Sequence, residues 1–172
     1  IGTPVTYAVG QTTSFPSQIC LGVASGTPTT TSGSSSIGAY SLSGAAELTP
    51  KVSSTFNILA DQLLLKSFNI GFRFAGSHPN ITFTIRNGGG TIVYTKTTTI
   101  VQALAGTDAP VLINTTLPAG TGYTITITAP TVEQLQRGTW NTATNAGQIT
   151  YNGAGTGIDA VSNLQYDYFN YT

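Results

Sequence analysis

The stretch LLKSFNIGFRF, residues 64–74, decides the fold class. Phe68, Ile70, Phe72 and Phe74 recur at every second position, with small or polar residues between them. Successive side chains of a β-strand point to opposite faces of its sheet. This spacing therefore predicts a strand with one buried face and one solvated face.

The same alternation continues in residues 81–85 and 123–127, where Thr separates the apolar positions. Asn-Gly-Gly-Gly at residues 87–90 predicts a tight hairpin, because Gly adopts positive φ angles readily. Pro-Ala-Gly-Thr-Gly at residues 118–122 predicts a second turn. Only residues 131–138 combine helix formers with a glycine stop. We therefore predict an all-β, antiparallel, jelly-roll-like β-sandwich with at most one short helix.

A stretch rich in Ser, Thr and Gly interrupts the pattern at residues 25–36. Such a composition is typical of a surface loop or flexible connector. It divides the chain into an N-terminal arm and loop, residues 1–36, and a sandwich domain, residues 37–172.

The arm carries its own strand signal, since Val5, Tyr7 and Val9 alternate with small residues and Thr. A tethered strand of this kind can be donated to the open sheet edge of a neighbouring molecule. It can equally fold back as the edge strand of its own sheet. The sequence leaves both alternatives open.

Charge is scarce, with six Lys plus Arg and six Asp plus Glu in 172 residues and a formal net charge of zero. Nucleic acid and anionic lipid select clusters of Lys and Arg, so neither is an expected partner. The single cysteine, Cys20, allows no disulfide within the chain. No apolar run is long enough for membrane insertion. A surface dominated by Ser, Thr, Asn and Gly favours an extracellular location.

The residues that catalysis needs are few. Any Ser-His-Asp or Cys-His mechanism would have to use His78, which we interpret as a solvated turn residue before a proline. A glycosidase needs two carboxylates on opposite sides of a sugar, and the only glutamates are Glu47 and Glu133. We predict no catalytic residue and keep a glycoside-acting enzyme as a remote alternative.

Two kinds of binding site remain. Loop sites in sandwiches sometimes hold Ca²⁺ through acidic side chains and backbone carbonyls, and Asp159 and Asp167 are the candidates here; no other cofactor is expected. For carbohydrate, the candidates fall in one segment between the last strands, where long loops are expected. They are Arg137, Trp140, Asn141 and Tyr151.

Three triplets, at Asn80, Asn114 and Asn170, match the sequon for N-glycosylation. In a chain this rich in Thr such triplets also arise by chance. In the last strand, residues 166–171, aromatic residues occupy both even-numbered and odd-numbered positions. We expect either that both of its faces are covered or that one is exposed for contact.

The body of the chain, about residues 56–172, resembles β-sandwich modules of very large secreted surface proteins of Bacteroidetes, or of the fibres of their phages. The resemblance is carried by Phe-Asn-Ile-Gly-Phe-Arg-Phe (68–74), Leu-Pro-Ala-Gly-Thr-Gly-Tyr (117–123) and a Tyr-rich last strand (166–171). It implies a jelly-roll-like sandwich, an extracellular location and a non-catalytic role in adhesion or glycan contact.

Together these observations predict a non-catalytic structural or adhesive module of a cell-surface protein, a filament or a viral fibre. Its expected partners are copies of itself or neighbouring surface modules, joined through strands. A carbohydrate-binding module is the alternative.

Overall fold

The structure, a computed structural model, describes residues 30–37, 40–52, 55–105, 107–140, 147–151, 158–159 and 161–171. Within these ranges the chain forms strands and no helix. The strands are β1 Thr30–Ile37, β2 Tyr40–Leu48, β3 Lys51–Val52, β4 Phe56–Gly71, β5 Gly76–Arg86, β6 Ile92–Gln102, β7 Asp108–Thr128, β8 Gln134–Trp140, β9 Ile149–Tyr151, β10 Ile158–Asp159 and β11 Val161–Tyr171.

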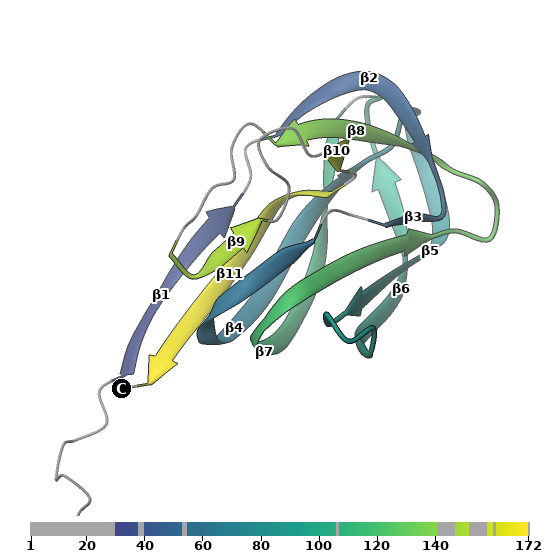
Figure 1. Cartoon of the computed structure of the whole chain (residues 1–172). Helices are drawn as coiled ribbons and strands as arrows, with labels where there is room; N and C mark the ends of the chain where they lie inside the picture. Colours follow the sequence, from purple (N-terminus) through teal and green to yellow (C-terminus); the bar gives the residue numbers. More distant parts are fainter. Residues whose placement is uncertain are drawn as a thin grey trace, which may run out of the picture.

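The strands form two antiparallel sheets (Figure 1). The larger has the order β1-β11-β4-β7-β5-β6, with β3 also paired to β7 and β9 also paired to β4. The smaller has the order β10-β8-β2. An isolated bridge between Phe72 and Leu135 joins the end of β4 to β8. The prediction of an all-β, antiparallel sandwich is confirmed.

Two long strands, β4 and β7, organise the larger sheet. The first part of β7 pairs with β4, from Asp108 opposite Gly71 to Tyr123 opposite Phe56. The second part pairs with β5, where Ile127 lies opposite Phe83. Breaks in the β4–β7 register bend the pair, as bulges do. β7 thus carries the sheet from one layer of the sandwich into the other.

The core lies between these layers. The Phe68 ring of β4 meets the Phe83 ring of β5 edge to face, with centroids 5.2 Å apart, although the two strands are not paired in the sheet. Phe72, Ile85 and Ile125 are fully buried in the same cluster. The alternation in the sequence therefore marks the buried face correctly, with one exception.

The exception is Phe74, which is 58% exposed. The predicted strand continues through residue 74, whereas β4 ends at Gly71. Once the strand ends, alternation no longer decides which way a side chain points. The prediction that Phe74 is buried is wrong for this reason.

The hairpin at residues 87–90 is confirmed, since β5 and β6 pair antiparallel across it. Gly90 has a φ of 81° and donates its N–H to the carbonyl of Asn87. The Asn87 side chain also accepts N–H groups from Gly89 and Thr91. Its amide oxygen fixes the turn.

The predicted turn at residues 118–122 is wrong, because β7 runs through it without reversing. Gly122, with a φ of 71°, bends the strand instead of ending it. Its N–H is bound by the side chain of Asn57. The Tyr123 hydroxyl donates to the Pro118 carbonyl across the bend.

Two further expectations fail locally. The loop predicted over residues 25–36 is wrong from Thr30 onward, because β1 pairs with β11 along its whole length. Pairing at a sheet edge needs backbone groups rather than apolar side chains, so the composition of residues 30–36 does not indicate a strand. The helical signal at 131–138 is also wrong, because β8 pairs with β2 there. Tertiary pairing outweighs local propensity in this segment.

The Phe68–Phe83 contact gives a direct test of the core. We expect Phe83→Ala to lower the free energy of unfolding by about 3–5 kcal/mol, because it removes a fully buried ring and leaves a cavity. Phe74→Ala, which truncates an exposed ring, is the matched control and should change stability by about 0.5 kcal/mol or less. Urea denaturation measures both. Equal losses in the two variants would contradict this assignment of the core.

Candidate interaction surfaces

The structure places the backbone of three residues predicted to bind glycan. Arg137 and Trp140 lie on β8, and Tyr151 lies on β9. Trp140 is paired with Tyr40 of the smaller sheet, whereas Tyr151 is paired with Phe56 of the larger one. Asn141 lies outside the described residues. A common glycan site formed by these residues stays a prediction.

The predicted assembly arm, with Val5, Tyr7 and Val9, also lies outside the described residues. The division of the chain at residue 36 therefore stays a prediction. Two sequon residues, Asn80 and Asn114, are exposed and have positive φ angles of 55° and 54°. Asn170 donates its side-chain N–H to Gln148. Glycosylation of these sequons stays a prediction.

The two predicted calcium ligands lie in different sheets. Asp159 is on β10, opposite Gly138, and Asp167 is on β11, opposite Ser34. The Asp167 carboxylate accepts hydrogen bonds from the Ser34 hydroxyl and from the Lys66 ammonium. No group of three or more His, Cys, Asp or Glu side chains gathers among the described residues. Calcium binding stays a prediction.

His78 is buried, so its interpretation as a solvated turn residue is wrong. Its ring stacks on Phe72, with centroids 3.7 Å apart. Nδ1 lies 3.0 Å from a carboxylate oxygen of Glu133, and Nε2 lies 3.2 Å from the carbonyl of Phe74. A carbonyl and an ionised carboxylate both only accept hydrogen bonds, so each ring nitrogen faces an acceptor. Both nitrogens are engaged in holding the segment after β4 against the segment before β8.

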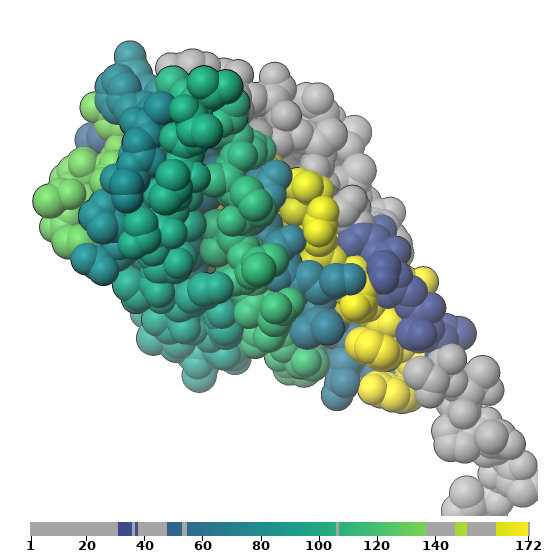
Figure 2. Space-filling view, turned by 180° about the vertical axis from the view of Figure 1, so that it is seen from behind, coloured from purple at the N-terminus to yellow at the C-terminus, as the bar shows by residue number. Residues whose placement is uncertain are grey.

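β1, β11 and β4 share an outward face on the side of the sheet away from the core. Tyr166 and Leu164 of β11 point into the core, so the odd-numbered side chains from Gln165 to Tyr171 point outward. Figure 2 shows this surface, with β11 in yellow between β1 and β4. The last strand meets neither expectation in full: Gln165 and Tyr171 are exposed, whereas residues 167–170 are half-buried on both faces.

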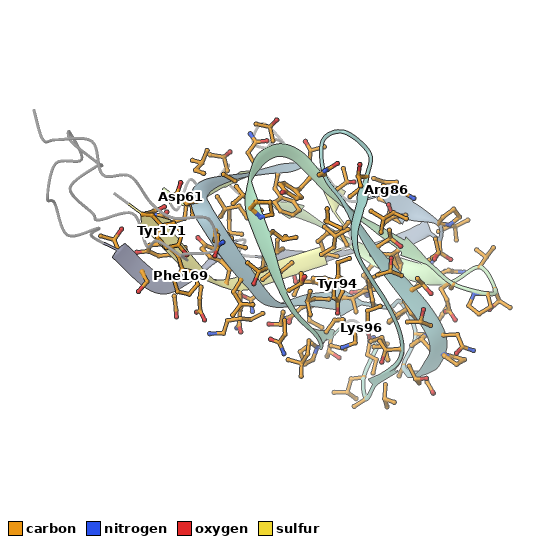
Figure 3. The ribbon with its side chains drawn as sticks, turned by 90° about the horizontal axis from the view of Figure 1, so that it is seen from below. Asp61, Arg86, Tyr94, Lys96, Phe169 and Tyr171 are labelled. Carbon is orange, nitrogen blue, oxygen red and sulfur yellow. The ribbon has the colours of Figure 1, made fainter. Side chains whose placement is uncertain are left out.

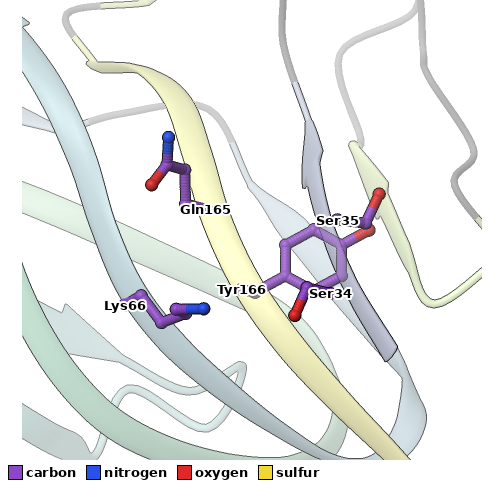
Figure 4. Close-up of a pocket in the computed structure, with 5 residues that line it drawn as sticks. All are labelled: Ser34, Ser35, Lys66, Gln165 and Tyr166. Atoms are coloured by element: carbon purple, nitrogen blue, oxygen red, sulfur yellow. The ribbon is translucent and has the colours of Figure 1, made fainter. Parts of the chain in front are cut away.

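A polar hollow of about 400 Å³ lies on these strands. It is lined by Ser34, Ser35, Lys66, Gln165 and Tyr166 (Figure 4). The Lys66 ammonium forms an ion pair with Asp167 at 2.9 Å beside it. The hydrogen bond from Ser34 and the nearby charge of Lys66 lower the pKa of the Asp167 carboxyl.

The β1 edge is a third feature of this side of the molecule. β1 pairs with β11 through eight consecutive residues, from Thr30 opposite Tyr171 to Ile37 opposite Leu164, without a register shift. Within the described part of the chain, no strand pairs with its other edge. Its sequence, TTSGSSSI, contains no charge and no proline.

The opposite edge of the sheet, β6, is arranged differently. The Tyr94 hydroxyl and the Lys96 ammonium of β6 donate to the carbonyls of Ile113 and Leu112 in β7. These side chains draw β6 toward β7 and leave a hollow of about 200 Å³ between the two strands. Lys96 also gives this edge the positive charge that commonly guards a sheet edge.

No protein-family model matches the chain, and no curated protein matches it. Among solved structures, the chain is similar to a structure of infectious bursal disease virus, Gt strain, with 11% sequence identity and a TM-score of 0.28. The match covers 84% of this chain and 42% of the viral chain. The chain is also similar to the VP2 subviral particle of that virus, at 12% identity and a TM-score of 0.28, over 83% of this chain and 32% of that chain.

The chain thus spans less than half the length of these viral proteins. Scores of this size establish neither a shared fold nor a shared function. The described residues include no helix long and apolar enough to span a membrane. The resemblance to Bacteroidetes surface modules stays a prediction.

Asp167 gives a pH-dependent prediction. Its folded-state pKa lies below the ordinary pKa of an aspartate, so its contribution to stability is present above that ordinary pKa and is lost as pH falls through the folded pKa. We expect Asp167→Asn to lower the free energy of unfolding at pH 7 by about 0.2–1 kcal/mol, the range for an accessible ion pair. Chemical denaturation from pH 7 down to pH 2 should show the two proteins converging. A difference that persists unchanged at the lowest pH would contradict this account.

Proposed function

We propose that this chain is a non-catalytic structural module of an extracellular or virion surface, and that it joins neighbouring copies by strand addition at the β1 edge. One observation carries the proposal: within the described part of the chain, β1 is a long, regular edge strand with which only β11 pairs. An exposed edge presents unpaired N–H and C=O groups that can pair with another chain.

The proposal follows from what β1 lacks. Natural monomers protect sheet edges with lysine, proline, bulges or very short strands. β1 has eight residues in unbroken register, with no lysine, no proline and no bulge. β6, in contrast, carries Lys96, whose ammonium donates to a carbonyl of β7. The difference between the two edges favours β1 as the joining surface.

A second copy of this chain is the expected partner. An antiparallel β1–β1 contact uses the same residues on both molecules, which gives a closed two-fold interface. Its hydrogen bonds come from the backbone and need no special side chain. The zero formal net charge of the chain adds no long-range repulsion between copies.

The setting of the module is inferred from composition and resemblance. A surface made of Ser, Thr and Asn with few charges suits an extracellular or packed environment. The similarity of residues 56–172 to surface and fibre modules supports the same setting. His78 supports the absence of catalysis, since both of its ring nitrogens are held in structural contacts.

Proline substitution tests the edge with a built-in control. Consecutive residues of a strand direct their N–H groups to opposite edges, so Thr31→Pro and Ser32→Pro each remove a donor from a different side of β1. We expect one variant to lose pairing with β11 and to melt earlier. The other should keep the native melting temperature and lose self-association by about tenfold or more.

Sedimentation velocity over a concentration series, together with thermal unfolding, measures both properties. Unchanged association in the variant that melts normally would overturn the proposal, as would a wild-type chain that stays monomeric throughout. Deletion of residues 1–24 identifies the donor strand. Association that survives the deletion supports edge-to-edge pairing, whereas its loss would overturn that pairing in favour of a donated arm.

A further inference from the structure

Two aromatic side chains, the half-buried Phe169 and the exposed Tyr171, lie on the outward face of β11, where the other outward residues are mostly polar. Phe169 lies opposite Ser32 of β1 and Gln62 of β4, and directly paired residues project from the same face of a sheet. Tyr171 is 53% exposed. The hydrophobic core lies on the opposite side of β11, so Phe169 and Tyr171 are not part of the core cluster.

Tyr171 is held in place although it lies at the end of its strand. Its hydroxyl donates to the Gln62 amide oxygen at 3.1 Å, and its N–H donates to a carboxylate oxygen of Asp61 at 2.7 Å. The Asp61 N–H donates to the Asn170 side chain at 3.3 Å. Residues at the end of a strand often fray. This network fixes an exposed ring, which is the preorganisation that a binding platform needs; Figure 3 labels Asp61, Phe169 and Tyr171 at this end of the molecule.

The charges on this side favour an uncharged ligand. Lys66 and Asp167 form an ion pair and so cancel each other. Asp61 beside Tyr171 adds a negative charge, which disfavours an anion. Farther along the same strands, the hollow lined by Ser34 and Gln165 offers hydroxyl and amide groups that both donate and accept hydrogen bonds.

We infer that this face binds a neutral oligosaccharide. The apolar C–H faces of sugar rings pack on Phe169 and Tyr171, while Gln62 and the polar hollow bind sugar hydroxyls. The two aromatic positions are about 7 Å apart along the strand, which suits consecutive sugars of a chain rather than one sugar. The site differs from the predicted set around Trp140 and does not depend on self-association at the β1 edge.

Isothermal titration calorimetry with cellohexaose, maltohexaose, xylohexaose and mannohexaose tests the inference, with polygalacturonate as the acidic comparison. We expect at least one neutral hexasaccharide to bind. Phe169→Ala and Tyr171→Ala should each weaken binding by about tenfold, the loss of one ring contact. Tyr171→Phe keeps the ring and should retain most of the affinity.

Two controls locate the site. Phe74→Ala removes an exposed phenylalanine that lies beyond the end of β4 and should leave binding unchanged. Trp140→Ala should also leave it unchanged, and a loss there instead of at Tyr171 would overturn the assignment. Absence of binding to all four neutral sugars, or binding of polygalacturonate that is lost in Lys66→Ala, would overturn the inference as well.

Self-association at the β1 edge and sugar binding on β11 can be tested independently of each other. The proline variant of β1 that melts normally should still bind the sugar, because its substitution changes edge pairing and not the rings of β11. Loss of sugar binding in that variant would show that the face needs the assembled state, and would overturn the independence claimed here.

Discussion

The pairing of β4 with β7 positions the rest of the larger sheet. β11 and β9 pair with β4, and β5 and β3 pair with β7, so each of these strands depends on the register that the two long strands share. Alternate side chains of both strands point inward along most of that register. Bulges in the pair bend it and bring Phe68 and Phe83 into contact across the core. Apolar burial at every second position is therefore the constraint that the architecture satisfies first.

The two edges of the larger sheet differ. The Tyr94 and Lys96 side chains of β6 reach carbonyl groups of β7, and Lys96 places a positive charge at that edge. β1 lies at the other end of the sheet, where its pairing with β11 has no register shift. Within the described chain no further strand pairs with either edge, and of these two edge strands only β6 carries a lysine. A molecule guarded by charge at one edge can form pairs through the other, and it resists unlimited stacking.

Sequence periodicity predicted the core because burial acts on single residues at fixed spacing. Phe72, Ile85 and Ile125 are all fully buried, and the hairpin at Asn87 follows from turn chemistry that is local to four residues. β1 was missed because pairing at an edge uses backbone groups that every residue has. The bend at Gly122 was read as a turn, since a glycine-rich segment looks the same in sequence whether the chain reverses or only bends.

The candidate surfaces were harder to predict for the same reason. His78 was assigned to solvent because its stacking partner, Phe72, and its carboxylate partner, Glu133, lie on other segments. For the last strand, aromatic residues at odd and even positions leave two alternatives, and its actual burial depends on segments distant in sequence that pack against its faces. Gln62 is more than 100 residues from Tyr171 in sequence, so no spacing rule could place its amide beside that hydroxyl.

Amide hydrogen exchange of β1, followed residue by residue as the protein is concentrated, tests the central claim most directly. In dilute solution, the β1 amides that bond to β11 should be protected and the alternate ones should exchange rapidly. Concentration should then protect the alternate amides. Protection that appears only on β6, or no change anywhere on β1, would contradict the account.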